Sequence, residues 1–91
     1  MIALLRFDGS DDDLQQQLEE LLDLLADKPG FLSGRVGRAT DDQSAWVVAT
    51  EWEGAGTYRR ALSSYQVKVL APLLGRARPE ASAFEVLKAR P

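Results

Sequence analysis

The stretch AWVVATEWEGAGTYRRALSS, residues 45–64, decides the fold, because the spacing of its apolar residues changes in the middle. Residues 45–53 are rich in β-branched, aromatic and small side chains, which is typical of a strand. A glycine-rich break follows, and from Tyr58 onward apolar residues recur at helical spacing. We expect the helix to begin at Thr57 or as early as Gly54. The stretch therefore predicts a strand, a turn and a helix.

The preceding segment predicts a partner for this strand. FLSGRVGRAT, residues 31–40, has strand character, and its two internal glycines, Gly34 and Gly37, are typical of a bulge or of close approach by a neighbouring group. The polar residues 41–44, DDQS, form a turn between the two strands. Residues 31–53 therefore predict a β-hairpin.

A strand and an amphipathic helix are predicted before the hairpin. IALLRF, residues 2–7, is a short apolar run that ends in a polar turn. We expect Ser10 to cap the helix that follows, with residues 11–13 as acidic residues at its positive end. Five leucines then fall on one helical stripe. They are Leu14, Leu18, Leu21, Leu22 and Leu25.

The last third of the chain predicts more helix and a final strand. Apolar residues share one helical stripe from Tyr58 to Val69, although Pro72 argues against one uninterrupted helix. ASAFEVLKA, residues 81–89, alternates as a strand does. The order strand, helix, strand, strand, helix, strand predicts an α+β, ferredoxin-like βαββαβ fold with a four-stranded antiparallel sheet. We expect residues 1–91 to form a single domain.

The composition excludes several classes of site. The chain contains no cysteine, histidine or asparagine, so thiolate nucleophiles, histidine-based triads and histidine-bound metals are absent, and we expect no cofactor. The net charge is −3 and the basic residues are scattered, which argues against nucleic acid binding. No apolar run is long enough to cross a membrane, and the first residues do not form a signal peptide. A cytoplasmic location is expected.

Both faces of the predicted sheet are apolar. Successive side chains of a strand point to opposite faces of the sheet. In the strand over residues 45–53, one face therefore carries Trp46, Val48, Thr50 and Trp52, and the other carries Ala45, Val47, Ala49 and Glu51. The small residues suit the face beneath the helices, and the tryptophans then need a cover of their own. A second copy of the sheet is the simplest cover, so we predict a homodimer formed sheet against sheet.

With these elements in place, the chain resembles the antibiotic biosynthesis monooxygenase (ABM) family of dimeric α/β barrels. Three stretches carry the resemblance over nearly the whole chain: PGFLSGRVGR, WVVATEWEGAGTYRRALSS and APLLGRARPEASAFEVL. The family includes cofactor-free oxygenases that form quinones and haem-degrading enzymes. Haem-degrading members need a helix histidine, which this chain lacks.

The resemblance implies a pocket between helices and sheet with Trp52 and Tyr58 as its catalytic residues. Cofactor-free members use a strand asparagine, a tryptophan four residues later and a tyrosine six residues after that. Trp52 and Tyr58 match this spacing, whereas the asparagine position falls on Val48. Trp52 would stack on a planar ring and Tyr58 would hydrogen-bond it. The expected substrate-binding residues are Trp46, Val48, Arg35 and Tyr65.

Two functions remain open from the sequence. The first is a cofactor-independent monooxygenase that acts on a small planar aromatic or quinol substrate, for which the protein supplies orientation and electrostatic cover. The second is a non-catalytic dimeric domain that binds a small apolar ligand or acts as a scaffold. In the second case Trp52 and Tyr58 simply fill the seam between helices and sheet.

Overall fold

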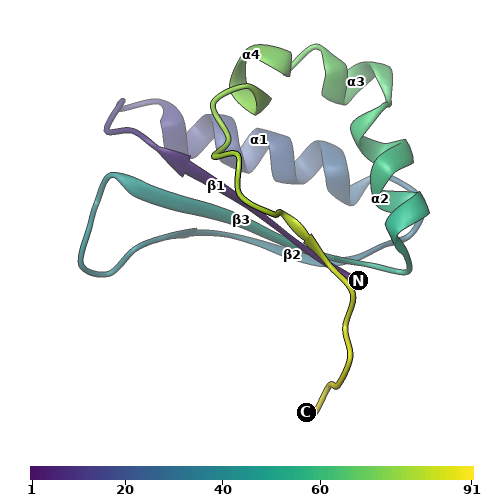
Figure 1. Cartoon of the computed structure of the whole chain (residues 1–91). Helices are drawn as coiled ribbons and strands as arrows, with labels where there is room; N and C mark the ends of the chain where they lie inside the picture. Colours follow the sequence, from purple (N-terminus) through teal and green to yellow (C-terminus); the bar gives the residue numbers. More distant parts are fainter.

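A computed structural model describes all 91 residues and has the predicted order of elements, with three short helices in place of one second helix (Figure 1). The strands are β1 (Ile2–Asp8), β2 (Phe31–Arg38), β3 (Ala45–Trp52) and β4 (Ala83–Phe84). The helices are α1 (Leu14–Ala26), α2 (Ala55–Leu62), α3 (Tyr65–Lys68) and α4 (Ala71–Leu74).

The four strands form one antiparallel sheet in the order β2-β3-β1-β4. All four helices lie on the same side of this sheet, so the other side is open (Figure 1). The prediction of a ferredoxin-like α+β fold is therefore confirmed. No helix is long and apolar enough to cross a membrane.

The leucine stripe of α1 forms the centre of the core, as predicted. Leu14, Leu18, Leu21 and Leu25 are completely buried against the sheet. The predicted capping by Ser10 is wrong, because α1 begins at Leu14 with Asp13 at the N-cap position. Residues 11–13 instead form the turn that leads from β1 into the helix.

The tryptophan face of β3 is the one that lies beneath the helices. Trp46, Val48, Thr50 and Trp52 are buried there. The interpretation that placed the small residues under the helices is therefore wrong. Large aromatic side chains fill the space between sheet and helices and bury more apolar area than alanine could. The small residues of β3 lie on the open face.

Glycines allow the hairpin to approach the helical layer closely. Gly30, in the turn before β2, has φ of +89°, and a Cβ atom there would lie 2.4 Å from Thr57. At Gly34 a Cβ atom would lie 2.5 Å from the Leu22 side chain. The predicted close approach at Gly34 is confirmed. The register shift in β2 falls between Phe31 and Ser33 and includes neither Gly34 nor Gly37.

The C-terminal third differs most from the expectation. The apolar stripe does not continue past α2, because the chain turns at residues 63–64 and leaves Tyr65 and Val69 exposed. The predicted strand over residues 81–89 shrinks to two residues, since β4 pairs only with the first two residues of β1.

Candidate functional site

Trp52 lies at the C-terminal end of β3, in the seam between the sheet and the helices. Only 1% of it is exposed. Its ring meets the edge of Phe31 at a centroid distance of 5.3 Å and an angle of 87°. Its Nε1 atom donates a hydrogen bond of 2.8 Å to Thr50 Oγ1 on the same face of the strand. Trp52 is therefore held in a single orientation.

Tyr58 is the second aromatic of the pair and comes from α2. The start of this helix is set by Gly54 and Thr57, since the Thr57 hydroxyl donates a 2.7 Å hydrogen bond to the Gly54 carbonyl and accepts one from its N–H. That turn directs Tyr58 inward, where its ring lies 5.5 Å from Trp52. The sequence spacing of the pair thus corresponds to direct packing.

The hydroxyl of Tyr58 is buried without a hydrogen-bond partner. Ser82, just before β4, is close to it but outside hydrogen-bonding geometry. An unpaired buried hydroxyl costs about 1–3 kcal/mol of stability. Most buried polar groups have a partner, so this hydroxyl is available to a polar group that enters the seam.

Burial raises the pKa of the Tyr58 phenol above its usual value of 10.0, and nearby Ser82 opposes the rise to a smaller extent. The unfolded chain would then ionise first as the pH rises past 10, so folding stability should fall above that pH. We expect the unfolding midpoint to drop more steeply between pH 10 and 11 than in Tyr58→Phe. Denaturant titrations of both proteins would measure this. Parallel curves would contradict the burial of the phenol.

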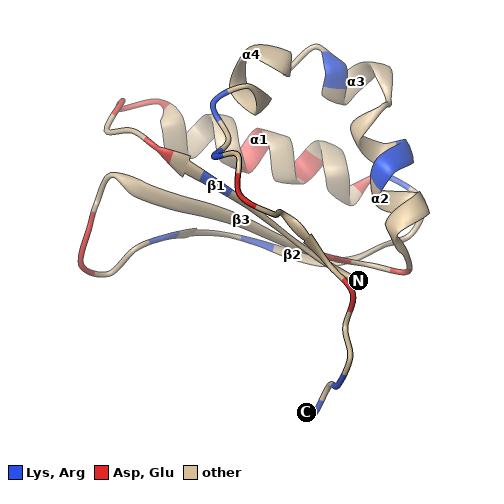
Figure 2. Cartoon of the chain, in the orientation of Figure 1, with Lys and Arg blue, Asp and Glu red and all other residues tan.

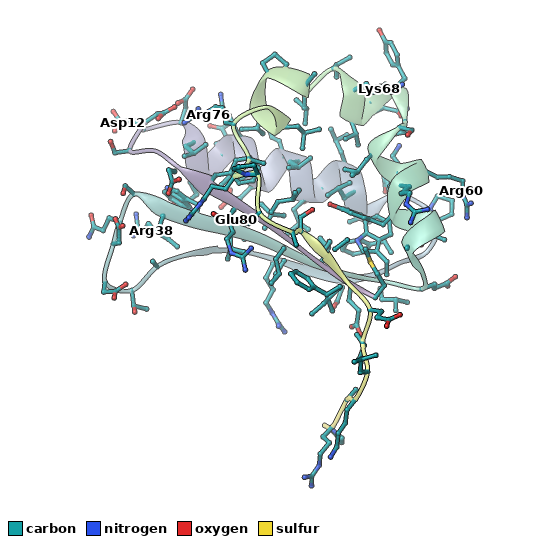
Figure 3. The ribbon with its side chains drawn as sticks, viewed as in Figure 1. Asp12, Arg38, Arg60, Lys68, Arg76 and Glu80 are labelled. Atoms are coloured by element: carbon teal, nitrogen blue, oxygen red, sulfur yellow. The ribbon has the colours of Figure 1, made fainter.

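Trp46 and Val48 share the helix-facing side of β3 with Trp52 but do not join the aromatic pair. Val48 is buried two pleats from Trp52 and brings no polar atom to the seam. Trp46 lies at the opposite end of the strand, where its Nε1 donates to the Gly9 carbonyl and the Arg38 guanidinium lies 5.3 Å above its ring. Figure 3 shows Arg38 at this end of the sheet.

The two remaining predicted site residues lie elsewhere. Arg35 pairs with Ala49 in the sheet and points to the open face, away from the aromatic pair. Tyr65 is 80% exposed at the start of α3. Arg60, on the outside of α2, points away from the body (Figure 3). The structure therefore brings together Trp52 and Tyr58 and separates them from the other candidates.

The seam around the aromatic pair is filled by side chains. Neither Trp52 nor Tyr58 lines any of five pockets on the surface of the chain. Two of those pockets, of about 240 and 280 Å³, lie on the open face of the sheet. A ligand of the aromatic pair would therefore have to displace a covering segment. No group of His, Cys, Asp or Glu side chains is placed to hold a metal ion.

Sequence reasoning missed three neighbours of the pair: Phe31, Thr50 and Ser82. The period of the strand already placed Thr50 beside Trp52, so that signal was available. Ser82 lies 24 residues beyond Tyr58 in the chain, and only the folded structure brings them together.

Comparison with known families gives one match. Residues 7–72 match the model of the family described as antibiotic biosynthesis monooxygenase. That range includes the strand-to-helix passage with Trp52 and Tyr58. No curated protein sequence gives a significant match.

Solved structures share the fold at low sequence identity. An alanine variant of SnoaB, a cofactor-independent oxygenase from Streptomyces nogalater, matches with a TM-score of 0.81 and 21% identity, covering 99% of this chain and 95% of that chain. Rv0793 from Mycobacterium tuberculosis matches with a TM-score of 0.69 and 16% identity, covering 97% and 95%. A conserved protein from Methanosarcina mazei Go1 matches with a TM-score of 0.70 and 15% identity, covering 90% of this chain and 84% of that chain. These likenesses support the fold.

Proposed function

The chain belongs to the antibiotic biosynthesis monooxygenase family, and on that basis we propose that it is a cofactor-independent monooxygenase acting on a small planar aromatic or quinol substrate. The observation that carries the proposal is the Tyr58 hydroxyl, which is buried beside the Trp52 ring without a partner. A phenolic or enolic oxygen of a planar substrate would supply that partner.

Tyr58 would act as a hydrogen-bond donor and not as a base. Burial raises the pKa of its phenol, so the group stays protonated at neutral pH. A protonated phenol can donate to a substrate oxygen that becomes negative when the substrate loses a proton. In a site closed to water such a donor stabilises the anion strongly. The proton itself would pass to water or to a group outside the seam.

The oxidation balances without a cofactor. The substrate anion passes one electron to O₂, and the resulting substrate radical and superoxide combine to a peroxide anion on the ring carbon. This anion takes up one proton, equal to the one the substrate lost, and becomes a hydroperoxide. Loss of water from the hydroperoxide then leaves a carbonyl. A phenol with a hydrogen on the reacting carbon and one O₂ thus give one quinone and one H₂O. The protein would orient the ring against Trp52 and hold its oxygen at Tyr58.

Access requires movement, since Trp52 and Tyr58 are only 1% and 4% exposed. The segment that runs from α4 to β4 is held to β1 by backbone hydrogen bonds, from Arg78 N–H to the Arg6 carbonyl and from Leu4 N–H to the Ser82 carbonyl, and by surface ion pairs. Arg76 contacts both carboxylate oxygens of Asp11 at 2.9 and 3.2 Å, near the start of α1. Arg78 lies 3.8 Å from Asp8. Exposed pairs of this kind are weak, so opening the segment would mainly require breaking its backbone hydrogen bonds to β1.

The experiment is oxygen uptake by the purified protein with a panel of an anthrone, a naphthol and a benzoquinol. We expect uptake of one O₂ per substrate with at least one of them. A metal chelator should leave the rate unchanged.

A second function has its own supporting observation. The aromatic pair is closed, with only 1% of Trp52 and 4% of Tyr58 exposed, and the apolar Val48 occupies the position of the family's asparagine. A non-catalytic dimeric domain that binds a small apolar ligand or acts as a scaffold would need neither an open pocket at the aromatic pair nor a polar side chain at position 48. Absence of oxygen uptake with the whole panel would favour this second function.

We also propose that the chain forms a homodimer through its open sheet face. Ile2 and Phe84 are each 37% exposed there, beside half-buried Leu4 and Val47. Ile2 pairs with Phe84 and Leu4 pairs with Ala49, while Val47 lies opposite Arg6. The apolar residues form a patch bordered by charged ones, which a second copy can cover.

Light scattering at low micromolar concentration should give about twice the 10.0 kDa mass of the chain. We expect the dimer mass because a monomer would leave the apolar face of its sheet exposed to water. Val47→Glu, which puts a charge in the middle of the face, should shift the mass toward monomer. A stable wild-type monomer would refute the dimer.

A further inference from the structure

Three arginines line one groove of about 240 Å³, here called the arginine groove, at the end of the sheet next to the turn between β2 and β3. They are Arg6 on β1, Arg38 on β2 and Arg78 before β4, and Asp8 is the acidic residue of the lining. Figure 2 shows basic residues on β1, on β2 and in the segment before β4. Three positive charges and one negative charge give the lining a net charge of +2, whereas the whole chain carries −3. A groove lined by one sign of charge concentrates ions of the other sign, here anions.

The sheet itself brings two of these arginines together. Phe7 forms an antiparallel bridge with Ala77, so Arg6 lies directly opposite Arg78. The Arg78 N–H donates a 2.8 Å hydrogen bond to the Arg6 carbonyl, in agreement with this register. Like charges directly opposite each other on neighbouring strands are destabilising. An anion bound beside both guanidinium groups would offset that cost.

The carboxylates of the chain neutralise only one of the three arginines. Arg78 lies 2.7 Å from Glu80 and 3.8 Å from Asp8. Arg6 and Arg38 form no ion pair with a carboxylate of the chain. Arg6 is nevertheless half-buried on a central strand of the sheet. These two guanidinium groups are therefore available to an anion from outside the chain.

The floor of the arginine groove is largely apolar. Gly37, Val47 and Arg6 lie in one row across β2, β3 and β1. Gly37 brings no side chain to this row, and a Cβ atom there would lie 3.2 Å from the Val47 side chain. Glycine within a strand is typical of a place where another group approaches the backbone closely. Ala45 and Trp46 line the groove beside this row, so the space above Gly37 suits a hydrocarbon group.

We propose that the arginine groove binds a small organic carboxylate. The two oxygens of a carboxylate match the fork of N–H donors on a guanidinium group, so Arg6 and Arg78 would hold the charged end. The apolar floor would contact the hydrocarbon end. Pockets for drug-sized ligands have about 300–1,000 Å³, and the groove has about 240 Å³. The ligand should therefore be smaller than a drug-sized molecule.

This binding site goes beyond the proposed oxidation and is separate from the aromatic pair. Trp52 and Tyr58 are buried on the helix side of the sheet and do not line the groove. Arg6 lies toward the opposite end of β1 from Ile2, which pairs with Phe84 in the apolar patch of the open face. Two grooves of like charge repel each other, so a two-fold axis through them is disfavoured. Carboxylate binding therefore requires neither the oxidation nor the dimer.

A nuclear magnetic resonance titration of the isotope-labelled protein tests the site, with benzoate as the probe. We expect saturable shifts of the Gly37, Ala39 and Val47 amide signals, because these residues line the groove. Benzyl alcohol has the ring without the charge, and acetate has the charge without the ring. Each should bind about tenfold more weakly than benzoate, or weaker still. Absence of saturable shifts with benzoate would overturn the proposal, and so would equal binding of benzoate and either control.

Arg6→Met keeps a long side chain and removes both the charge and the donors. We expect it to weaken benzoate binding by about tenfold or more. The free variant should be at least as stable as the wild type, because the repulsion from Arg78 is removed. Arg59→Met is the matched control, since Arg59 is an exposed arginine on α2 that does not line the groove. It should bind benzoate as the wild type does.

A second variant keeps the test independent of the central strand. Arg38→Met changes a residue of the edge strand β2, and it should also weaken benzoate binding. The amide spectrum of each variant shows whether it is folded. Folded Arg6→Met and Arg38→Met proteins that bind benzoate as tightly as Arg59→Met would overturn the proposal.

Discussion

Trp52→Ala is expected to remove about 3–5 kcal/mol of folding free energy, the usual cost of deleting a buried large aromatic side chain. The substitution removes the ring contacts with Phe31 and Tyr58 and the hydrogen bond to Thr50. A domain of 91 residues has a total stability of roughly 5–14 kcal/mol. The variant should therefore lose much of its stability, which urea titration followed by circular dichroism would measure.

Leu32→Ala is the matched control, since Leu32 is a large apolar residue on the neighbouring strand but is 54% exposed. Its effect should stay within about 0.5 kcal/mol. A Trp52→Ala protein as stable as this control would show that Trp52 is not part of a packed core.

Tyr58→Phe is expected to have opposite effects on stability and activity. The change keeps the ring packed against Trp52 and removes only the unpaired hydroxyl. Loss of that buried polar atom should stabilise the free protein by about 1 kcal/mol. For a domain of this size the unfolding temperature would rise by roughly 4–8 °C, which calorimetry can detect.

The same hydroxyl is the donor proposed for the substrate anion, so its removal should lower kcat/KM. Removal of one donor from an oxyanion site costs on the order of 10²–10³ in rate, and we expect a loss of about 10²-fold. A gain in stability together with a loss of turnover is typical of a residue kept for function. A loss of both would indicate that Tyr58 serves only to support the core.

The sequence predicted well those helices and strands whose apolar residues recur at a regular spacing. The leucines of α1 recur at helical spacing because one face of the helix is buried, and the structure places Leu14, Leu18, Leu21 and Leu25 there. The hairpin and the order of strands and helices along the chain followed from the same patterns.

The sequence was a poor guide to the faces of the sheet. Alternation in β3 separated two sets of residues correctly, but both sets are apolar, so the pattern could not assign the set beneath the helices. The apolar pattern also predicted too long a last strand. Residues after Phe84 continue the pattern, but pairing with β1 ends at Phe84.

The aromatic pair was predictable only in part. The spacing of Trp52 and Tyr58 spans one strand end and one helix start, so a short-range pattern could bring them together. The exposure of Tyr65 depends on the turn at residues 63–64, and the position of Arg35 depends on which sheet face is open. Both depend on tertiary packing, which the spacing of apolar residues does not encode.

The most direct test of the proposed site is kcat/KM for oxygen uptake by Tyr58→Phe and Tyr65→Phe, measured side by side with the best substrate of the panel. Both variants lose one phenolic hydroxyl, but only that of Tyr58 is buried beside Trp52, whereas Tyr65 is 80% exposed. The proposed site predicts that Tyr65→Phe keeps the wild-type value and that Tyr58→Phe falls about 10²-fold below it. Equal values for the two variants would contradict a site at Trp52 and Tyr58.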